Sequence, residues 1–115
     1  MKINHNVLQM VRGDSETLHV TVKNYELSES DSVILSVRNV GRSAMAASLT
    51  AGNTLYFTKT ATISDGVATI EIDPGDTKDM SPGRYVYDIE LTTASGDVHT
   101  IVPINYLVII DEVSV

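Results

Sequence analysis

The sequence predicts an all-β fold, a two-sheet antiparallel sandwich of about seven or eight short strands with one helical turn near residues 74–80. Residues 65–91 carry most of this prediction, because two segments there alternate apolar and polar residues with the two-residue period of a strand. Turn residues separate further short segments of strand composition along the chain. Valine, isoleucine and threonine are abundant, which also favours sheets.

The two strands of this stretch each have one apolar face. Alternation places Ala68, Ile70 and Ile72 together in the first strand, and Tyr85, Tyr87, Ile89 and Leu91 together in the second. Asp65 and Gly66, just before the first strand, form a two-residue hairpin signal. We therefore expect the two apolar faces to lie in the core.

One helical turn is predicted between these strands. Asp73 can accept amide hydrogens at a helix start, and Pro74 presets the first helical φ. Pro82 and Gly83 end the turn. Met80 is the large apolar side chain expected to reach the core.

The other segments are predicted from weaker patterns. Residues 3–11 alternate poorly and indicate an edge strand or one that bends or changes sheets, while residues 17–22 and 33–40 are strands separated by a polar loop at 24–32. Residues 42–52 have no clear period and indicate a loose loop or a poor helical turn, so the structure of residues 41–54 stays open. In residues 54–63, Lys59 falls on the apolar face, which is typical of an edge strand.

The last strands flank a proline. A turn at residues 94–97 leads into a strand at 98–102, and residues 106–110 form the final strand. Pro103 has no amide hydrogen, so we expect it at an edge, a bulge or a break. Since no repeat or second pattern appears, residues 1–115 are predicted to form a single domain.

Composition argues against several functions. The formal net charge is -7 and the basic residues are scattered, so nucleic-acid binding has little support. The absence of cysteine rules out disulfides and thiolate metal sites. Neither a signal peptide nor an apolar run of membrane-spanning length is apparent, so we expect a soluble product made in the cytoplasm, with no membrane insertion.

The tripeptide Arg12-Gly13-Asp14 matches the integrin-recognition motif. A three-residue match is weak, and glycine followed by aspartate is ordinary turn chemistry. We therefore prefer the structural interpretation of this turn.

Two acidic groups could supply oxygen ligands to calcium. They are Asp73, Asp76 and Asp79, and Glu26, Glu29 and Asp31. Neither matches the twelve-residue calcium loop, and helix capping or a solvated loop explains them equally well. No metal site or cofactor is predicted.

The histidines do not indicate catalysis. His5, His19 and His99 lack metal-binding spacing, and Ser95 and Asp97 near His99 define no nucleophile and base geometry. The glycines sit singly at turns, so there is no phosphate-binding loop. We expect no enzymatic activity.

The order of the motifs resembles a known family. Arg12-Gly13-Asp14 before a strand, then DGVATIEIDPGDT, PGRYVYDIEL, His99 and a final strand are similar to small immunoglobulin-like modules of bacteriophages and prophages. These modules are related to the N-terminal domain of baseplate upper proteins of phages that infect Gram-positive bacteria. The resemblance covers nearly the whole chain, most specifically residues 65–91 and least in residues 41–54.

This resemblance implies an immunoglobulin-like β-sandwich used in tail or baseplate architecture. The family has no catalytic residues to carry over, and we expect a single module without the longer C-terminal region of a full baseplate protein. The implied location is the virion, or the bacterial cytoplasm for a prophage product.

Two functions follow as hypotheses. The first is a phage structural or assembly module that binds itself or other phage structural proteins. The second is a carbohydrate-binding or host-surface adhesion module, which needs exposed aromatic rings with convergent polar groups. Tyr25, Tyr56 and Tyr106 are the candidate rings, because they lie outside the strand assigned to the core.

Apolar residues on both faces of the terminal strands suggest where a protein partner binds. Alternation places Leu8 and Met10 on the opposite face from Val7 and Val11. It likewise places Leu107 and Ile109 opposite other apolar residues of the last strand, whereas a sandwich buries only one face of each strand. These four residues are the predicted interface. The alternative is that the two terminal strands pair in the middle of a sheet and are covered by a loop, perhaps residues 42–52.

Overall fold

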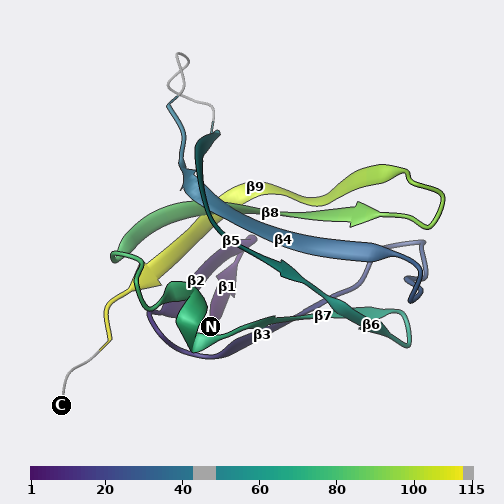
Figure 1. The fold of residues 1–115 in the computed structure, drawn as a ribbon, viewed down its shortest axis with the longest axis horizontal. Helices are drawn as coiled ribbons and strands as arrows, with labels where there is room; N and C mark the ends of the chain where they lie inside the picture. The colour runs from purple at the N-terminus through teal and green to yellow at the C-terminus, as the bar shows by residue number, and fades with distance from the viewer. Residues whose placement is uncertain (43–48, 113–115) are drawn as a thin grey trace.

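The computed structural model describes residues 1–42 and 49–112, which form a sandwich of two β-sheets (Figure 1). The larger sheet has six strands in the order β1-β2-β9-β8-β4-β5, and the smaller has three in the order β3-β7-β6. The elements are β1 Lys2–Asn4, β2 Val7–Val11, β3 Glu16–Val20, β4 Ser32–Val40, β5 Ala51–Thr60, β6 Thr62–Ser64, β7 Val67–Ile72, α1 Pro74–Thr77, β8 Gly83–Thr92 and β9 Val98–Ile110. The predicted all-β sandwich is confirmed, with nine strands in these residues.

The N-terminal segment is a hairpin of two strands, β1 and β2. His5 and Asn6 connect them with φ values of 50° and 65°, and Asn4 pairs with Val7. Two central residues with positive φ are the geometry of a tight hairpin that follows the twist of its strands. The mixed alternation of residues 3–11 arises because the chain reverses direction in the middle of that segment.

Strand β9 joins the two ends of the chain. It pairs with β8 in antiparallel fashion and with β2 in parallel, where Leu8 stands beside Leu107 and Met10 beside Ile109. The register between β8 and β9 shifts beside Ile89, and Pro103 lies in the part of β9 that this shift leaves unpaired. Pro103 therefore interrupts the ladder locally while the strand continues, in agreement with the bulge expected from its missing amide hydrogen.

The chain passes from the large sheet to the small one between β5 and β6. β5 is an edge strand of the large sheet, and β6, which begins two residues after it, is an edge strand of the small sheet. The Ala61 amide, at the crossing point, donates to the carbonyl oxygen of Val33, 2.8 Å away. This confirms the edge position that Lys59 indicated in the sequence, and it closes one side of the sandwich.

The predicted helical turn is present as α1, which ends at Thr77. The carboxylate of Asp76 accepts the Asp73 amide at 2.7 Å, so the acidic residues of this segment cap the helix start. Beyond α1, the Met80 amide donates to the Thr77 carbonyl oxygen, and the Met80 side chain is buried as expected.

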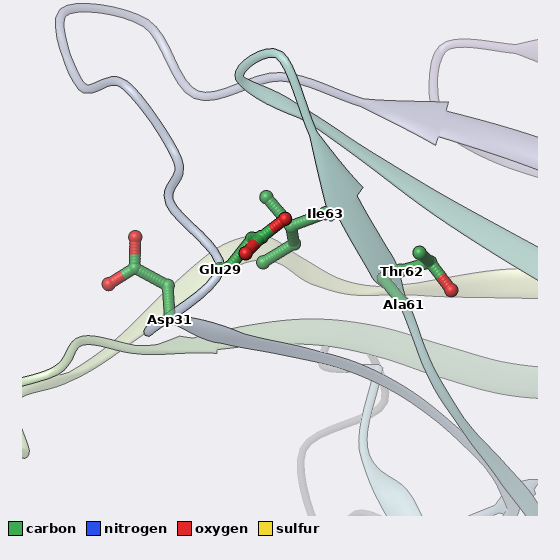
Figure 2. Close-up of a pocket in the computed structure, with 5 residues that line it drawn as sticks. All are labelled: Glu29, Asp31, Ala61, Thr62 and Ile63. Atoms are coloured by element: carbon green, nitrogen blue, oxygen red, sulfur yellow. The ribbon is translucent and has the colours of Figure 1, made fainter.

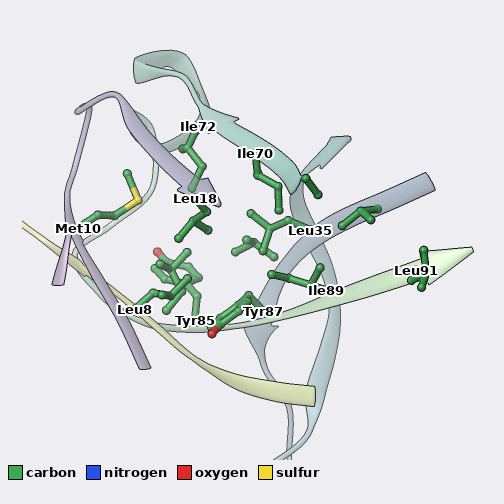
Figure 3. Packing of buried hydrophobic residues seen from close by; sticks show 14 of the residues in the cluster. Leu8, Met10, Leu18, Leu35, Ile70, Ile72, Tyr85, Tyr87, Ile89 and Leu91 are labelled. Carbon is green, nitrogen blue, oxygen red and sulfur yellow. The ribbon is translucent and has the colours of Figure 1, made fainter. Parts of the chain in front are cut away.

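The core lies between the two sheets (Figure 3). The apolar residues assigned to the inner faces of β7 and β8 are all buried in it. The Tyr87 hydroxyl is satisfied there, because it donates to the carbonyl oxygen of Asn6. Burial raises the pKa of Tyr87 to about 12.

The structure corrects the predicted protein interface. Leu8, Met10, Leu107 and Ile109 are at most 4% exposed and belong to the core. The parallel pairing of β2 with β9 puts all four on the inner face, which supports the alternative that the terminal strands pair inside a sheet. Part of the loop suggested as their cover, residues 43–48, lies outside the described residues.

The face assignment of β8 can be tested with neighbouring substitutions. Ile89→Ala should lower the free energy of unfolding by about 2 to 5 kcal/mol, because it removes a buried branched side chain from a packed core. Glu90→Ala, at an exposed neighbouring position, should cost well under about 1 kcal/mol. Denaturant midpoints measure both, and equal losses would contradict the assignment.

Candidate functional site

The exposed edge of β5 is the candidate functional site. Four strands lie at the ends of the two sheets, and β5 has ten residues, whereas β1 and β6 have three each and β3 has five. An edge strand has unpaired backbone amide and carbonyl groups that can pair with another chain, and short edges limit this tendency. β5 therefore offers the longest such edge among the described residues.

Apolar side chains are exposed along and beside this edge. Leu55 is 47% exposed and Tyr56 is 42% exposed, and Val40 at the end of β4 is 37% exposed. In the pairing with β4, Val37 faces Phe57 and Arg38 faces Leu55, so Tyr56 is an extra, bulged residue. Val37 points into the core, so its chain neighbour Arg38 points to the outer face. Leu55 pairs with Arg38 and therefore lies on the same outer face. The Tyr56 ring packs edge-on against buried Tyr85, with 4.9 Å between centroids.

The charge on β5 is neutralised within the domain. Lys59 is the one charged residue of the strand, and its ammonium lies 2.9 Å from Asp73 and 2.8 Å from Asp76. These carboxylates, Asp76 first, raise the pKa of Lys59 above its usual value. Since the chain carries a formal net charge of -7, the edge of β5 is a neutral strip on an acidic protein.

The acidic residues considered as calcium ligands make contacts within the protein. In the first group, Asp73 and Asp76 form ion pairs with Lys59. In residues 1–42 and 49–112, no three histidine or acidic side chains gather closely enough to hold a metal ion.

Asp31 anchors the loop that precedes β4. It is 7% exposed, and its carboxylate accepts hydrogen bonds from the Tyr25 hydroxyl at 2.9 Å, the Ser28 amide at 2.9 Å and the Ala94 amide at 3.2 Å. The Ser28 amide contributes most to holding the pKa of Asp31 below its usual value, and the Tyr25 hydroxyl and Ala94 amide add to it. The carboxylate thus ties this loop to the turn between β8 and β9.

A pocket of about 240 Å³ lies beside Asp31, lined also by Glu29, Ala61, Thr62 and Ile63. Figure 2 shows the carboxylates of Glu29 and Asp31 standing apart from each other. The carboxylate of Asp31 already accepts hydrogen bonds from donors within the protein. It therefore shapes the wall of the pocket and does not form a pair with Glu29 that could bind a ligand. The volume of the pocket is also below the range of about 300 to 1,000 Å³ typical of ligand pockets.

A second pocket, of about 300 Å³, lies under the β8–β9 hairpin. Its walls are mostly apolar and are formed by Val22, Tyr25, Leu91, Thr93, His99 and Ile101. The Tyr25 hydroxyl in this wall is already bonded to Asp31. The pocket is therefore a small apolar depression at the lower limit of ligand-site volumes.

The Arg12 to Asp14 turn is held by contacts within the protein. Arg12 forms an ion pair with Asp111 at 2.8 Å, and the Gly13 amide donates to the buried hydroxyl of Thr77 at 2.9 Å. Gly13 has a φ of 81°, a conformation that favours glycine. These contacts support the structural interpretation of the turn.

Ser95 and Asp97 belong to the β8–β9 turn. The Ser95 hydroxyl donates to Asp97 at 3.2 Å, and among the described side chains no hydrogen bond joins either residue to His99. His99 lies in β9, where it pairs with Leu91, and His5 occupies the β1–β2 turn. The histidine His19 is in β3, beside Thr69 of β7. The three histidines are therefore in three separate places.

The three candidate tyrosines also lie in different environments. Tyr25 is bonded to Asp31, Tyr56 packs on Tyr85, and Tyr106 has the Arg84 guanidinium 5.4 Å from its ring centroid. They do not form one aromatic platform of the kind that stacks sugars.

Comparison with known proteins found no matching family model and no matching curated protein. No helix within the described residues is long and apolar enough to cross a membrane.

Sequence reasoning identified the edge character of β5 but not the exposure of Leu55. Lys59 on the apolar face was the signal for an edge. The start of β5 was hidden because Gly52 and Asn53 have poor strand propensity. Alternation predicts Leu55 on the same face as Phe57 and Lys59, and it leaves Tyr56 as a candidate exposed ring. The bulge at Tyr56 shifts this parity, so Leu55 lies on the outer face beside Arg38 while Phe57 stands beside buried Val37.

Asp31→Asn tests the anchor of the loop. The substitution replaces one acceptor oxygen by a donor that faces other donors, so the denaturant midpoint at pH 7 should fall. Glu29→Gln, on the same loop and exposed, is the matched control and should leave the midpoint nearly unchanged.

The lowered pKa of Asp31 also predicts how the difference in stability between wild type and Asp31→Asn depends on pH. A carboxyl whose pKa is lower in the folded state stabilises the protein above its unfolded pKa, about 3.9, and loses that contribution as the pH falls through the folded value. The gap in stability between wild type and Asp31→Asn should therefore narrow on acidification below about pH 4. A gap that stays constant down to the acid transition would contradict this role.

Proposed function

We propose that this chain is a non-enzymatic structural or assembly module of a phage or prophage, associated with the tail or baseplate, which acts through protein–protein contacts at the edge of β5. The observation that carries the proposal is the long, exposed and neutral edge of β5 with Leu55 and Tyr56 along it. The resemblance of residues 65–91 to phage immunoglobulin-like modules supplies the phage context.

Strand addition is the mode of contact that this edge suits. A partner strand placed beside β5 would pair with its free backbone amide and carbonyl groups, each hydrogen bond contributing about 0.5 to 1.5 kcal/mol net. Leu55 on the outer face and Tyr56 near Tyr85 would add apolar contacts on the two sides of the new strand pair. The partners are other phage structural proteins or a second copy of this chain.

The phage role is tested on particles. Particles are purified from cells that carry the gene and are separated into head and tail fractions, and the chain is quantified by mass spectrometry. We expect the chain in the tail fraction at a fixed ratio to known tail proteins. Its absence from washed particles, while it accumulates in the same cells, would contradict the proposal.

The β5 contact is tested with matched variants supplied in place of the wild type. Leu55→Lys should reduce incorporation into particles, because it places a charge on the contact edge. Val98→Lys changes the net charge equally at an exposed residue of another strand and should be incorporated normally. Equal incorporation of both variants would show that β5 is not the contact.

A further inference from the structure

We infer that β5 pairs with β5 of a second copy of the chain, antiparallel about a two-fold axis beside Leu55, so that two six-stranded sheets join edge to edge. This inference rests on the proposed function and deepens it, because it names the partner of the same edge. A two-fold contact of this kind uses one surface patch twice and closes as a dimer.

The position of the apolar residues favours self-pairing. In ten-residue β5, Leu55 and Tyr56 are the two central residues. When two copies of a strand pair in antiparallel fashion about a two-fold axis perpendicular to the sheet, one residue can lie opposite its own copy. The residues that precede it in one copy then lie opposite the residues that follow it in the other. With Leu55 in that place, the two Leu55 side chains meet on the outer face, where each is 47% exposed in the single chain.

The charges allow the same arrangement. With Leu55 opposite its copy, and with the bulge at Tyr56 shifting the register by one residue, Lys59 falls opposite the uncharged start of the partner's β5, at Ala51 or Gly52. No charged residue of β5 therefore faces a like charge. Lys59 is in any case held by Asp73 and Asp76 of its own chain. The rest of the chain is acidic, with a formal net charge of -7, so two copies repel each other at a distance. Association should therefore strengthen when salt screens this repulsion.

The other edges suit this contact less well. β1 and β6 are three residues long, which leaves few backbone groups for pairing. β3 has five residues, and they include charged Glu16. Among the four strands at the ends of the described sheets, a long edge with apolar residues at its centre is found only for β5. The part of β9 before Leu107 also lacks a neighbour on the β2 side, but Pro103 removes one of its backbone amide donors.

The expected dimer is weak. A ten-residue strand spans about 33 Å, and pairing through a sheet about 10 Å thick buries roughly 700 Å² in total. Stable complexes usually bury about 1,200 Å² or more. The bulge at Tyr56 also limits regular pairing, as bulges at sheet edges do. A reversible contact of this strength suits an assembly in which neighbouring copies are held at high local concentration.

Sedimentation equilibrium over a range of protein concentrations, at about 20 and about 300 mM salt, tests self-association. We expect a reversible monomer–dimer equilibrium whose dissociation constant falls at the higher salt. Leu55→Lys should raise the dissociation constant at least tenfold, whereas Val98→Lys, with the same change in net charge, should leave it within about twofold of the wild type. Circular dichroism confirms that both variants are folded. A wild type that stays monomeric up to millimolar concentration, or equal effects of the two variants, would overturn the inference.

A cysteine crosslink tests the register. The chain has no cysteine, so a single introduced cysteine gives a clean signal. Under mild oxidation, Leu55→Cys should form a disulfide dimer much faster than Val98→Cys, because the two copies of residue 55 are brought side by side. Equal rates for the two variants would contradict pairing about Leu55.

The outcomes separate this inference from the function on which it rests. A strictly monomeric chain that is nevertheless found in tail fractions would refute self-pairing and leave the phage role standing. A dimer that pairs through Leu55 but is absent from particles would support self-pairing and refute the phage role.

Discussion

The structure depends on a three-stranded sheet covering a six-stranded one, with one hydrophobic core between them. Apolar inner faces of both sheets are buried against each other, and this burial is the main source of stability in such a fold. The smaller sheet cannot cover every strand of the larger one. The additional cover comes from elements that the chain places at the margins of the sandwich.

Each margin is held by a specific contact. Under the β8–β9 hairpin, Val22 and Tyr25 of the preceding loop form a wall, and Asp31 ties that loop to Ala94. The chain crosses directly from β5 to β6 beside Asp31, and Lys59 of β5 binds the acidic start of α1. At the end near α1, the Gly13 amide is bonded to Thr77. In these places the polar residues that resemble ligand or recognition motifs hold the loops against the core.

The free edge of β5 follows from the same geometry. β4 pairs with β8 on one side and β5 on the other, and β5 is the last strand of its sheet. The bulge at Tyr56 turns that ring toward Tyr85, while Leu55 remains on the outer face. The edge is therefore long enough to pair with a partner, and it is irregular enough for that pairing to be reversible.

Sequence periodicity predicted the local features well. The sequence predicted the inner faces of β7 and β8, the Asp65-Gly66 turn with φ values of 53° and 76°, and the edge position of Lys59. These features depend on neighbouring residues, so their signal lies within a short window.

The other features were not predicted because they depend on pairing between segments that are far apart in the sequence. Alternation separated the two faces of the terminal strands but could not show which face the parallel pairing of β2 with β9 would bury. The candidate site was misplaced for this reason, since Leu107 and Ile109 are core residues. The His5-Asn6 turn was missed because His-Asn is not one of the usual hairpin dipeptides such as Asn-Gly or Asp-Gly, although both residues adopt positive φ more often than most.

The central claim is that β5 carries the free edge through which the domain binds a partner. Amide hydrogen exchange measured by NMR, in dilute solution and at high protein concentration, tests it most directly. If the account is correct, amides of β5 around Leu55 gain protection at high concentration, while those of the edge strands β1, β3 and β6 keep their rates. Protection gained at another edge, with β5 unchanged, would contradict the account.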